Sequence, residues 1–139
     1  MIKDIVKDTE TLSKVSQNIT DKAEIDKVVK DLIDTAMAHI DICVGLAAIQ
    51  IGYPVKIFVI RTADDKFKPY INPVIINRSQ EKYIAKESCL SLDGEREVVR
   101  HKSVSALYTV GNKTVKENLT GYRAEIFQHE YDHLFGKLI

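Results

Sequence analysis

The chain has 139 residues, of which 45% are hydrophobic and 29% charged, a composition typical of one folded domain over residues 1–139. Its 20 basic and 20 acidic residues cancel, so there is no general electrostatic signal for nucleic acid or an anionic membrane. No run approaches the ~18 apolar residues of a transmembrane helix, and the N-terminus lacks a signal-peptide core. The sequence therefore predicts a cytoplasmic protein, in which Cys43 and Cys89 are thiols or metal ligands rather than a disulfide.

The first part of the chain predicts one long helix. Residues 1–20 are polar and only loosely periodic. Asp21 and Glu24 have the spacing of a capping box, and apolar residues then recur at helical intervals, which predicts a helix over residues 22–40 that covers a sheet. Residues 44–52 are small and apolar apart from Gln50, a pattern that suits close approach of two backbones or of backbone and ligand.

Short strand-like runs fill the middle of the chain. They cover residues 55–60, 70–76, 83–91, 97–100 and 104–110, and a last short strand begins at Val115. Turn signals stand at Asp64–Asp65 and Gly111–Asn112, and Pro73 marks an edge or an interruption. A final helix opens at Thr120–Gly121. The predicted class is α+β, with mostly antiparallel sheet structure packed around the C-terminal helix and an N-terminal helix covering the sheet.

This final helix contains the sequence His-Glu-Tyr-Asp-His over residues 129–133. Residues four apart on a helix lie ~40° apart around the axis and ~6 Å apart along it, so His129 and His133 can reach one metal ion. Glu130 lies beside that ion, where it can take a proton from a bound water. Gly136 stands where a helix C-cap usually falls. The simpler alternative is two histidines on a solvated helix face.

A complete metal site needs a third ligand from upstream. Only six residues follow His133, and none has a ligand side chain. Cys89 is a candidate, because a thiolate binds the same borderline to soft divalent metals as imidazole. Considered alone, Cys89 would be interpreted as a small core residue.

Three separated segments resemble the motifs of the peptide deformylases, in the same order. They are Gly-Leu-Ala-Ala-Ile-Gln at 45–50, Glu-Ser-Cys-Leu-Ser at 87–91, and Gln-His-Glu-Tyr-Asp-His at 128–133. The resemblance runs from about residue 28 to the end and is greatest to the short deformylases of Gram-positive bacteria. It implies a hydrolase that removes the N-formyl group from the N-terminal formyl-methionine of newly made bacterial or organellar proteins and releases formate.

The resemblance also implies roles for individual residues. One divalent metal ion, natively Fe²⁺ and replaceable by Zn²⁺, Ni²⁺ or Co²⁺, is held by the side chains of Cys89, His129 and His133. Glu130 is the general acid and base. The Gln50 side-chain amide and the Leu90 backbone N–H form the oxyanion hole.

Substrate recognition is expected from a strand edge and a side-chain slot. The backbone at Val44–Gly45 can pair with an extended peptide as an added strand. By the resemblance, Val44 and His129 line the methionine slot with Tyr122 and Ile126, and the three residues on the helix share one face. Arg96 is expected near the far end of the peptide, although a plain surface arginine is the alternative. The implied partner is a formyl-methionyl nascent chain near the ribosome, and the implied enzyme is a monomer.

Four positions depart from the deformylase pattern. Cys43 and Ser88 stand where the family usually has glycine, and Ile49 and Asp93 stand where proline is common. Since every ligand and catalytic position is present, we expect an active enzyme, and the departures bear on its rate and preference. Two alternatives remain open. One is a small metallo-amidase or peptidase that uses the same site, and the other is a weak or inactive module that binds formyl-peptide or metal.

Overall fold

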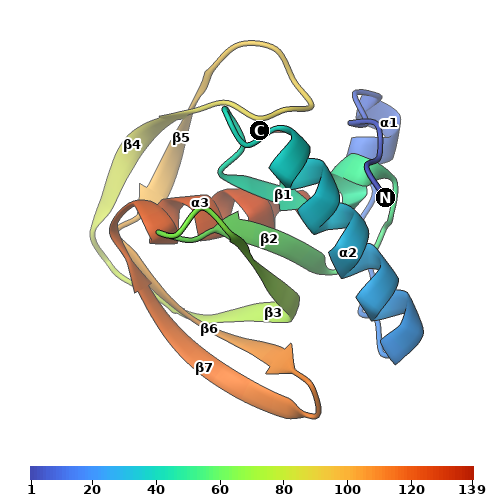
Figure 1. Cartoon of the computed structure of the whole chain (residues 1–139). Helices are drawn as coiled ribbons and strands as arrows, with labels where there is room; N and C mark the ends of the chain where they lie inside the picture. Colours follow the sequence, from blue (N-terminus) through green and yellow to red (C-terminus); the bar gives the residue numbers. More distant parts are fainter.

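The computed structural model describes residues 1–139 and confirms the α+β class. The helical elements are α1 (Thr9–Leu12), α2 (Lys22–Ala38), the 3₁₀ helix η1 (Ala48–Ile51) and α3 (Gly121–His133). The strands are β1 (Gly45–Ala47), β2 (Ile57–Arg61), β3 (Phe67–Arg78), β4 (Lys82–Glu87), β5 (Arg96–His101), β6 (Ser103–Val110) and β7 (Lys113–Thr120). An antiparallel sheet has the order β1-β2-β3-β6-β7, and β4 and β5 form a separate hairpin (Figure 1).

Strand β2 lies between α2 and α3, so its side chains are buried on both faces of the larger sheet. Successive side chains of a strand point to opposite sides. Accordingly, Phe58 belongs to the cluster that contains Phe127 of α3, whereas Val59 belongs to the cluster that contains Leu32 of α2. Each helix thus packs on the sheet, as the sequence predicted, and the two cover opposite faces of it at β2 (Figure 1).

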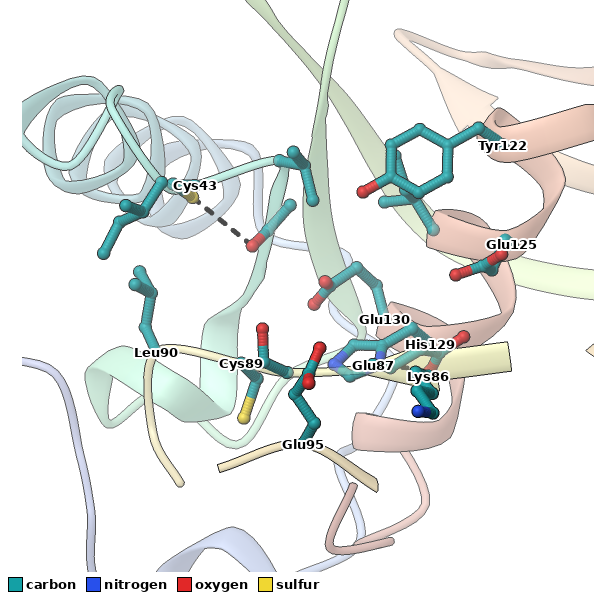
Figure 2. A pocket seen from close by; sticks show the side chains of 15 residues that line it. Cys43, Lys86, Glu87, Cys89, Leu90, Glu95, Tyr122, Glu125, His129 and Glu130 are labelled. Atoms are coloured by element: carbon teal, nitrogen blue, oxygen red, sulfur yellow. Dashed lines mark hydrogen bonds and ion pairs between the residues drawn. The ribbon is translucent and has the colours of Figure 1, made fainter. Parts of the chain in front are cut away.

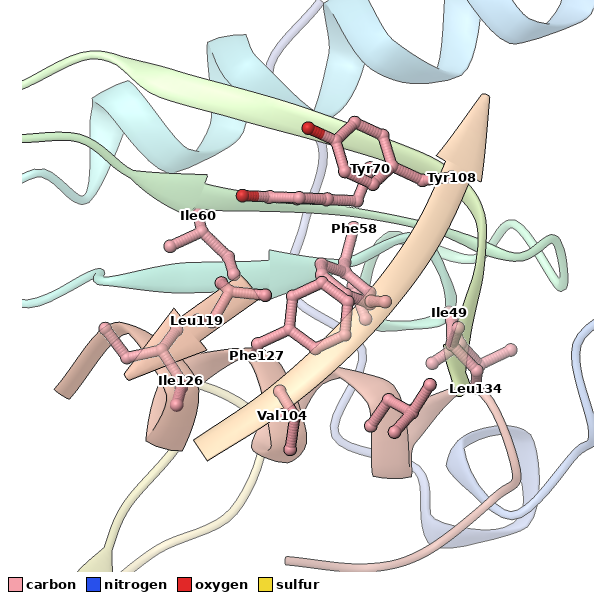
Figure 3. Packing of buried hydrophobic residues seen from close by; sticks show 14 of the residues in the cluster. Ile49, Phe58, Ile60, Tyr70, Val104, Tyr108, Leu119, Ile126, Phe127 and Leu134 are labelled. Atoms are coloured by element: carbon pink, nitrogen blue, oxygen red, sulfur yellow. The ribbon is translucent and has the colours of Figure 1, made fainter. Parts of the chain in front are cut away.

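Aromatic packing fixes α3 on the sheet. The ring of Phe127 meets Phe58 and Tyr70 edge to face, with centroids 5.0 and 5.1 Å apart (Figure 3). All three side chains are fully buried. Edge-to-face pairs of this kind contribute about 0.5–1.5 kcal/mol beyond the burial of their area. Since Phe127 is flanked on the helix by Ile126 and Gln128, this packing also sets the rotation of the helix that carries the two histidines.

The N-terminal region differs from the prediction in two places. α2 begins after Asp21, whose side chain accepts a hydrogen bond from the Ala23 N–H, but it ends at Ala38 rather than at residue 40. The backbone turns at His39, whose ring Nδ1 donates to the Thr35 carbonyl at 2.9 Å. α1 was not predicted, because four residues are too few for a helical period to emerge. Its N-cap is Asp8.

The strand boundaries also need correction. The predicted strand over 83–91 was wrong beyond Glu87, because β4 pairs only with β5 and the register ends at Glu87 and Arg96. β7 begins at Lys113 rather than at Val115, because the Gly111–Asn112 turn allows pairing at once. The interruption at Pro73 is confirmed by a register shift between Ile71 and Val74 in the pairing with β6.

The chain beyond α3 packs closely against the N-terminal segment. Leu134 is the C-cap of α3, and its carbonyl accepts a hydrogen bond from the Ser16 N–H at 2.8 Å. Gly136 follows with φ 77°, and a Cβ there would lie 2.2 Å from the Ser13 carbonyl oxygen. Gly136 is therefore required both by its backbone conformation and by this contact. None of the helices combines the length and apolar character needed to cross a membrane.

Candidate metal centre

Helix α3 presents two buried histidines toward one point. His129 and His133 are 6% and 1% exposed, and their ring centroids lie 4.9 Å apart. Cys89 joins them from the loop that follows β4. The Cys89 Sγ and one ring nitrogen of each histidine all lie within 4.8 Å of one another. The structure therefore brings together the three predicted ligands from two separate elements.

The protonation states of these side chains suit metal binding. Burial and the nearby His129 lower the pKa of His133 to about 3, which keeps its imidazole neutral. Burial raises the pKa of the Cys89 thiol, but the adjacent His129 ring and the backbone N–H groups of Ser91 and Leu92 together outweigh this, so the net shift of the pKa is downward. For His129, burial opposes protonation, yet Cys89 and Glu87 raise its pKa to about 10. A thiolate and a neutral imidazole are metal-binding forms, and binding a cation would release the proton of His129.

The site also contains buried polar atoms without a hydrogen-bond partner. They are His129 Nε2, both ring nitrogens of His133, and Glu130 Oε1. Each unsatisfied buried group of this kind costs roughly 1–3 kcal/mol, and such groups are rare in folded proteins. A divalent cation between Cys89 and the two imidazoles would satisfy the ring nitrogens that face it. The donor set of one sulfur and two nitrogens fits zinc and other borderline to soft divalent metals.

The side chain of Glu130 extends from α3 toward the edge strand β1. Its side chain is 3% exposed, and a Cβ built on Gly45 would stand only 2.8 Å from Oε2. A glycine at position 45 is thus required for the carboxyl group to occupy this place. Burial raises the pKa of Glu130 to about 7. A carboxyl group with such a pKa can both accept and donate a proton near neutral pH.

Three charged residues behind the ligands fix the orientation of His129. Its Nδ1 donates to Glu87 Oε1 at 2.8 Å, so Nε2 faces the metal position. Arg100 holds Glu87 with two hydrogen bonds of 2.6 and 2.9 Å, and it also donates to Asp132 at 2.6 Å. Sequence reasoning missed this role for all three residues. Glu87 and Asp132 adjoin the metal motifs, but Arg100 is recognisable only once β5 is paired with β4.

The predicted oxyanion-hole residues have different surroundings. Leu90 lines the pocket described below. Gln50 is 1% exposed, and its Oε1 accepts from the Ala47 N–H at 3.0 Å while its Nε2 donates to Ser91 Oγ at 3.1 Å. The amide thus bridges η1 and the loop that carries Cys89. Nε2 carries a second hydrogen besides the one that it donates to Ser91, although Gln50 is not among the residues that line the pocket.

A cavity of about 490 Å³ opens onto His129 and Glu130 (Figure 2). Its walls include four residues that the sequence assigned to substrate binding, namely Val44, Gly45, Tyr122 and Ile126. Arg96 is not among the lining residues, and its guanidinium donates to the Asp93 carbonyl within the loop. The charged groups around the cavity instead include three residues that sequence reasoning missed, which are Lys86, Glu95 and Glu125.

Cys43 also belongs to the wall of this cavity. Its thiol is not in a disulfide and points toward the Gly45 carbonyl, at 3.4 Å (Figure 2). Burial and the charge of Glu130 raise the pKa of Cys43 to about 12. At neutral pH this group is therefore a protonated thiol, and it is not part of the cluster of Cys89, His129 and His133.

Comparison with known proteins identifies the family. The sequence model of the polypeptide deformylases matches residues 2–139. A peptide deformylase of Clostridium beijerinckii is 41% identical over 140 residues, covering 100% of both chains. One from Pseudothermotoga lettingae is 43% identical over 131 residues, covering 91% of this chain and 74% of that one. The crystal structure of peptide deformylase from Thermotoga maritima has a TM-score of 0.89 and 33% identity, covering 99% of this chain and 95% of that one. The cluster of Cys89, His129 and His133 thus lies in a chain that belongs to the peptide deformylase family.

Proposed function

We propose that this chain removes the N-formyl group from the N-terminal formyl-methionine of newly made proteins and releases formate. One observation carries the proposal: the half-buried Cys89 and the buried His129 and His133 form a cluster beside a buried carboxyl group at the wall of a cavity. Membership of an enzyme family, with every predicted ligand and catalytic position present, supports activity rather than mere binding. Of the other functions considered, an inactive module would not need both Glu130 and Gln50.

The proposed cofactor is one divalent ion held by Cys89, His129 and His133, with Fe²⁺ expected in the cell and Zn²⁺, Ni²⁺ or Co²⁺ able to substitute. When bound, such an ion lowers the pKa of a water molecule and polarises a carbonyl group. The chain supports this with the hydrogen bond from His129 Nδ1 to Glu87, which leaves Nε2 free to face Cys89 and His133.

Glu130 is the proposed proton carrier. Its unpartnered Oε1 accepts a proton from the attacking water and delivers it to the amide nitrogen of methionine as the C–N bond breaks. The products are formate and a free α-amino group. The free hydrogen of Gln50 Nε2 and the Leu90 N–H are proposed to donate to the oxyanion of the tetrahedral intermediate. Losing one such donor typically costs about 10²–10³ in rate.

The substrate chain is proposed to extend along β1. This strand is at the edge of its sheet, and the Arg61 N–H donates to the Val44 carbonyl on its inner side. Backbone groups of the neighbouring Gly45 alternate to the outer side, where they can pair with an extended peptide. The methionine side chain would then enter the slot formed by Val44, Tyr122 and Ile126. An unbranched thioether fits such a slot better than a side chain branched at Cβ.

The setting of the reaction follows from its substrate. Formylated chains emerge from ribosomes, so we place the activity in the cytoplasm, close to the ribosome. We further propose a monomer as the working unit, because one chain supplies every residue of the cavity.

The decisive experiment is anaerobic metal analysis coupled to formate release from formyl-Met peptides. We expect turnover that requires stoichiometric metal, with formyl-norleucine close to formyl-Met, formyl-Val far lower, and acetyl-Met essentially uncleaved. The discrimination should be graded, since each methylene contributes only about 1–3 kcal/mol. Cleavage of acetyl-Met as fast as formyl-Met would contradict the proposal and favour a general amidase.

A further inference from the structure

A second cavity, of about 480 Å³, adjoins the metal pocket. Its walls come from the N-terminal segment 2–7, from His39 at the end of α2, and from Ile42 and Leu90. Ile42 and Leu90 also line the metal pocket. The two cavities therefore share a boundary, and a chain that leaves the metal pocket across this boundary enters the second cavity.

The charges of the two cavities differ in sign. The metal pocket carries the carboxylates Glu95 and Glu125 against one lysine, Lys86. In the second cavity two lysines, Lys3 and Lys7, stand against one aspartate. The boundary between the cavities is apolar, and the Ile42 side chain is 70% exposed although it is a large hydrophobic group. Such a surface suits a peptide that crosses the apolar boundary at Ile42 and Leu90 and then places an acidic side chain near Lys3 and Lys7.

The N-terminal segment is tied to the folded domain, so this cavity is a formed feature of the surface. The Lys3 N–H donates to Thr35 Oγ1 of α2 at 2.9 Å, and the Val6 N–H donates to the Gln50 carbonyl at 2.7 Å. The Lys3 ammonium also lies over the Tyr53 ring. The Lys3 contact holds this segment to α2, and the Val6 contact holds it to η1, the element that carries a proposed oxyanion-hole residue.

We propose that the second cavity is a downstream subsite that binds the formylated chain beyond methionine and favours an acidic side chain there. This inference rests on the proposed function. A cavity of about 490 Å³ is roughly 8 Å across, and an extended chain advances ~3.3 Å per residue. Counting methionine as the first residue, the peptide therefore reaches the boundary at about its third or fourth residue. The second cavity begins there, so an acidic side chain inside it belongs to about the fourth or fifth residue.

The test is a register scan with the metal-loaded enzyme. Formyl-Met peptides carry a single Glu at each position from the third to the sixth, with Gln at the same position as the reference. The kcat/KM ratio of Glu to Gln should peak at position four or five, at about three- to tenfold, and should shrink in high salt. The Lys3→Gln/Lys7→Gln double variant should lose the preference. Lys7→Gln alone should reduce it while preserving the contact between Lys3 and the Tyr53 ring.

A matched control removes the same charge elsewhere. Lys113→Gln/Lys116→Gln changes two lysines of β7, which lines neither cavity, and should keep the preference. Loss of the preference in this control, or equal Glu and Gln rates at every position, would overturn the subsite.

The peptide formyl-Met-Ala is too short to reach the second cavity and should be cleaved equally by all variants. If no metal-loaded variant cleaves it, the proposed function itself fails.

Discussion

The two ends of α3 carry polar groups whose hydrogen bonds are satisfied to very different degrees. At the N-terminal end, Arg123 belongs to what we call the Glu117 cluster, which consists of Lys68, Tyr70, Tyr108, Glu117 and Arg123. Glu117 Oε1 accepts from Lys68, Tyr70 and Tyr108 at 2.9, 3.1 and 2.9 Å, and Arg123 approaches Oε2 at 3.3 Å. At the C-terminal end, the rings of His129 and His133 retain nitrogens without a partner.

The contrast separates polar groups that stabilise the fold from those kept for a ligand. The charged side chains of the Glu117 cluster are partly buried and the two histidines almost fully buried, but burial alone does not show which group is kept for a ligand. Satisfaction does, because an unpaired buried donor or acceptor destabilises a protein unless something else binds it. We therefore expect changes at the metal centre to alter activity and metal content, and changes in the Glu117 cluster to alter stability alone. Five predictions test this division.

The largest effect is expected from the ligands. Cys89→Ala should lose most bound metal and nearly all formate release while remaining folded, because it removes the only sulfur of the ligand set. Cys43→Ala is the matched control, since this thiol faces the Gly45 carbonyl instead. Metal content by mass spectrometry and circular dichroism of both variants provide the measurements. Equal metal in wild type and Cys89→Ala would rule out the thiolate ligand, and loss in both variants would assign Cys43 to the site.

Glu130→Gln should lower formate release by about 10²–10⁴ while metal content is unchanged. The carboxyl group is not in the ligand cluster, and the amide has almost the same shape. Single-turnover rates on metal-loaded protein measure the effect. Near-normal turnover with metal bound would show that Glu130 does not carry the proton.

Gly45→Ala should displace Glu130 and reduce kcat by as much as about 10²-fold, the effect of a ~1 Å misplacement. The added Cβ would stand 2.8 Å from Glu130 Oε2 and 3.0 Å from Ile126. Gly111→Ala is a useful control, because it strains a backbone with positive φ but has no neighbour within 4 Å. The expected pattern is intact metal content with lost activity for Gly45→Ala, and lost stability with intact activity for Gly111→Ala. Wild-type kcat in Gly45→Ala would contradict the need for this close contact.

Arg100→Gln should weaken metal binding by about 10- to 100-fold, because Glu87 would no longer be held against His129. The matched change, Arg123→Gln, removes a guanidinium from the satisfied end of the same helix. It should lower the free energy of unfolding by about 1 kcal/mol and leave metal affinity unchanged. Competition with a chelator measures affinity for both variants. Similar losses of metal in the two variants would remove the distinction between the ends of α3.

The smallest effect is expected in the acid unfolding of Glu117→Gln. Burial raises the pKa of Glu117, but hydrogen bonds from Lys68 and Tyr108 lower it overall from 4.5. A carboxyl group with a depressed folded pKa stabilises the fold fully above its unfolded pKa and loses this contribution as pH falls through the folded value. Below pH ~4.5, stability should therefore fall less steeply with pH in Glu117→Gln than in wild type. Parallel pH profiles from urea unfolding would contradict this assignment.

The sequence predicted those features that depend on spacing along one element. His129, Glu130 and His133 are set by helical geometry, and the α2 start is set by Asp21. The partners of these residues were harder to foresee, because they come from pairing between distant segments. Arg100 reaches Glu87 only through the β4–β5 register. Whether Arg96 or its neighbour Glu95 lines the cavity depends on how the irregular loop enters β5, which no periodicity specifies.

The contact between Gly136 and Ser13 has a consequence for folding kinetics. The end of the helix that carries His129 and His133 is held by the opposite terminal region: the Ser16 N–H donates to the Leu134 carbonyl, and the Ser13 backbone packs closely against Gly136. Bringing such distant segments together involves loop closure, so these contacts are expected after the transition state rather than before it. Interactions formed that late mainly slow unfolding and have little influence on the rate of folding. We therefore expect this junction to slow unfolding, and so to prolong the lifetime of the assembled site, without changing the rate at which the site forms.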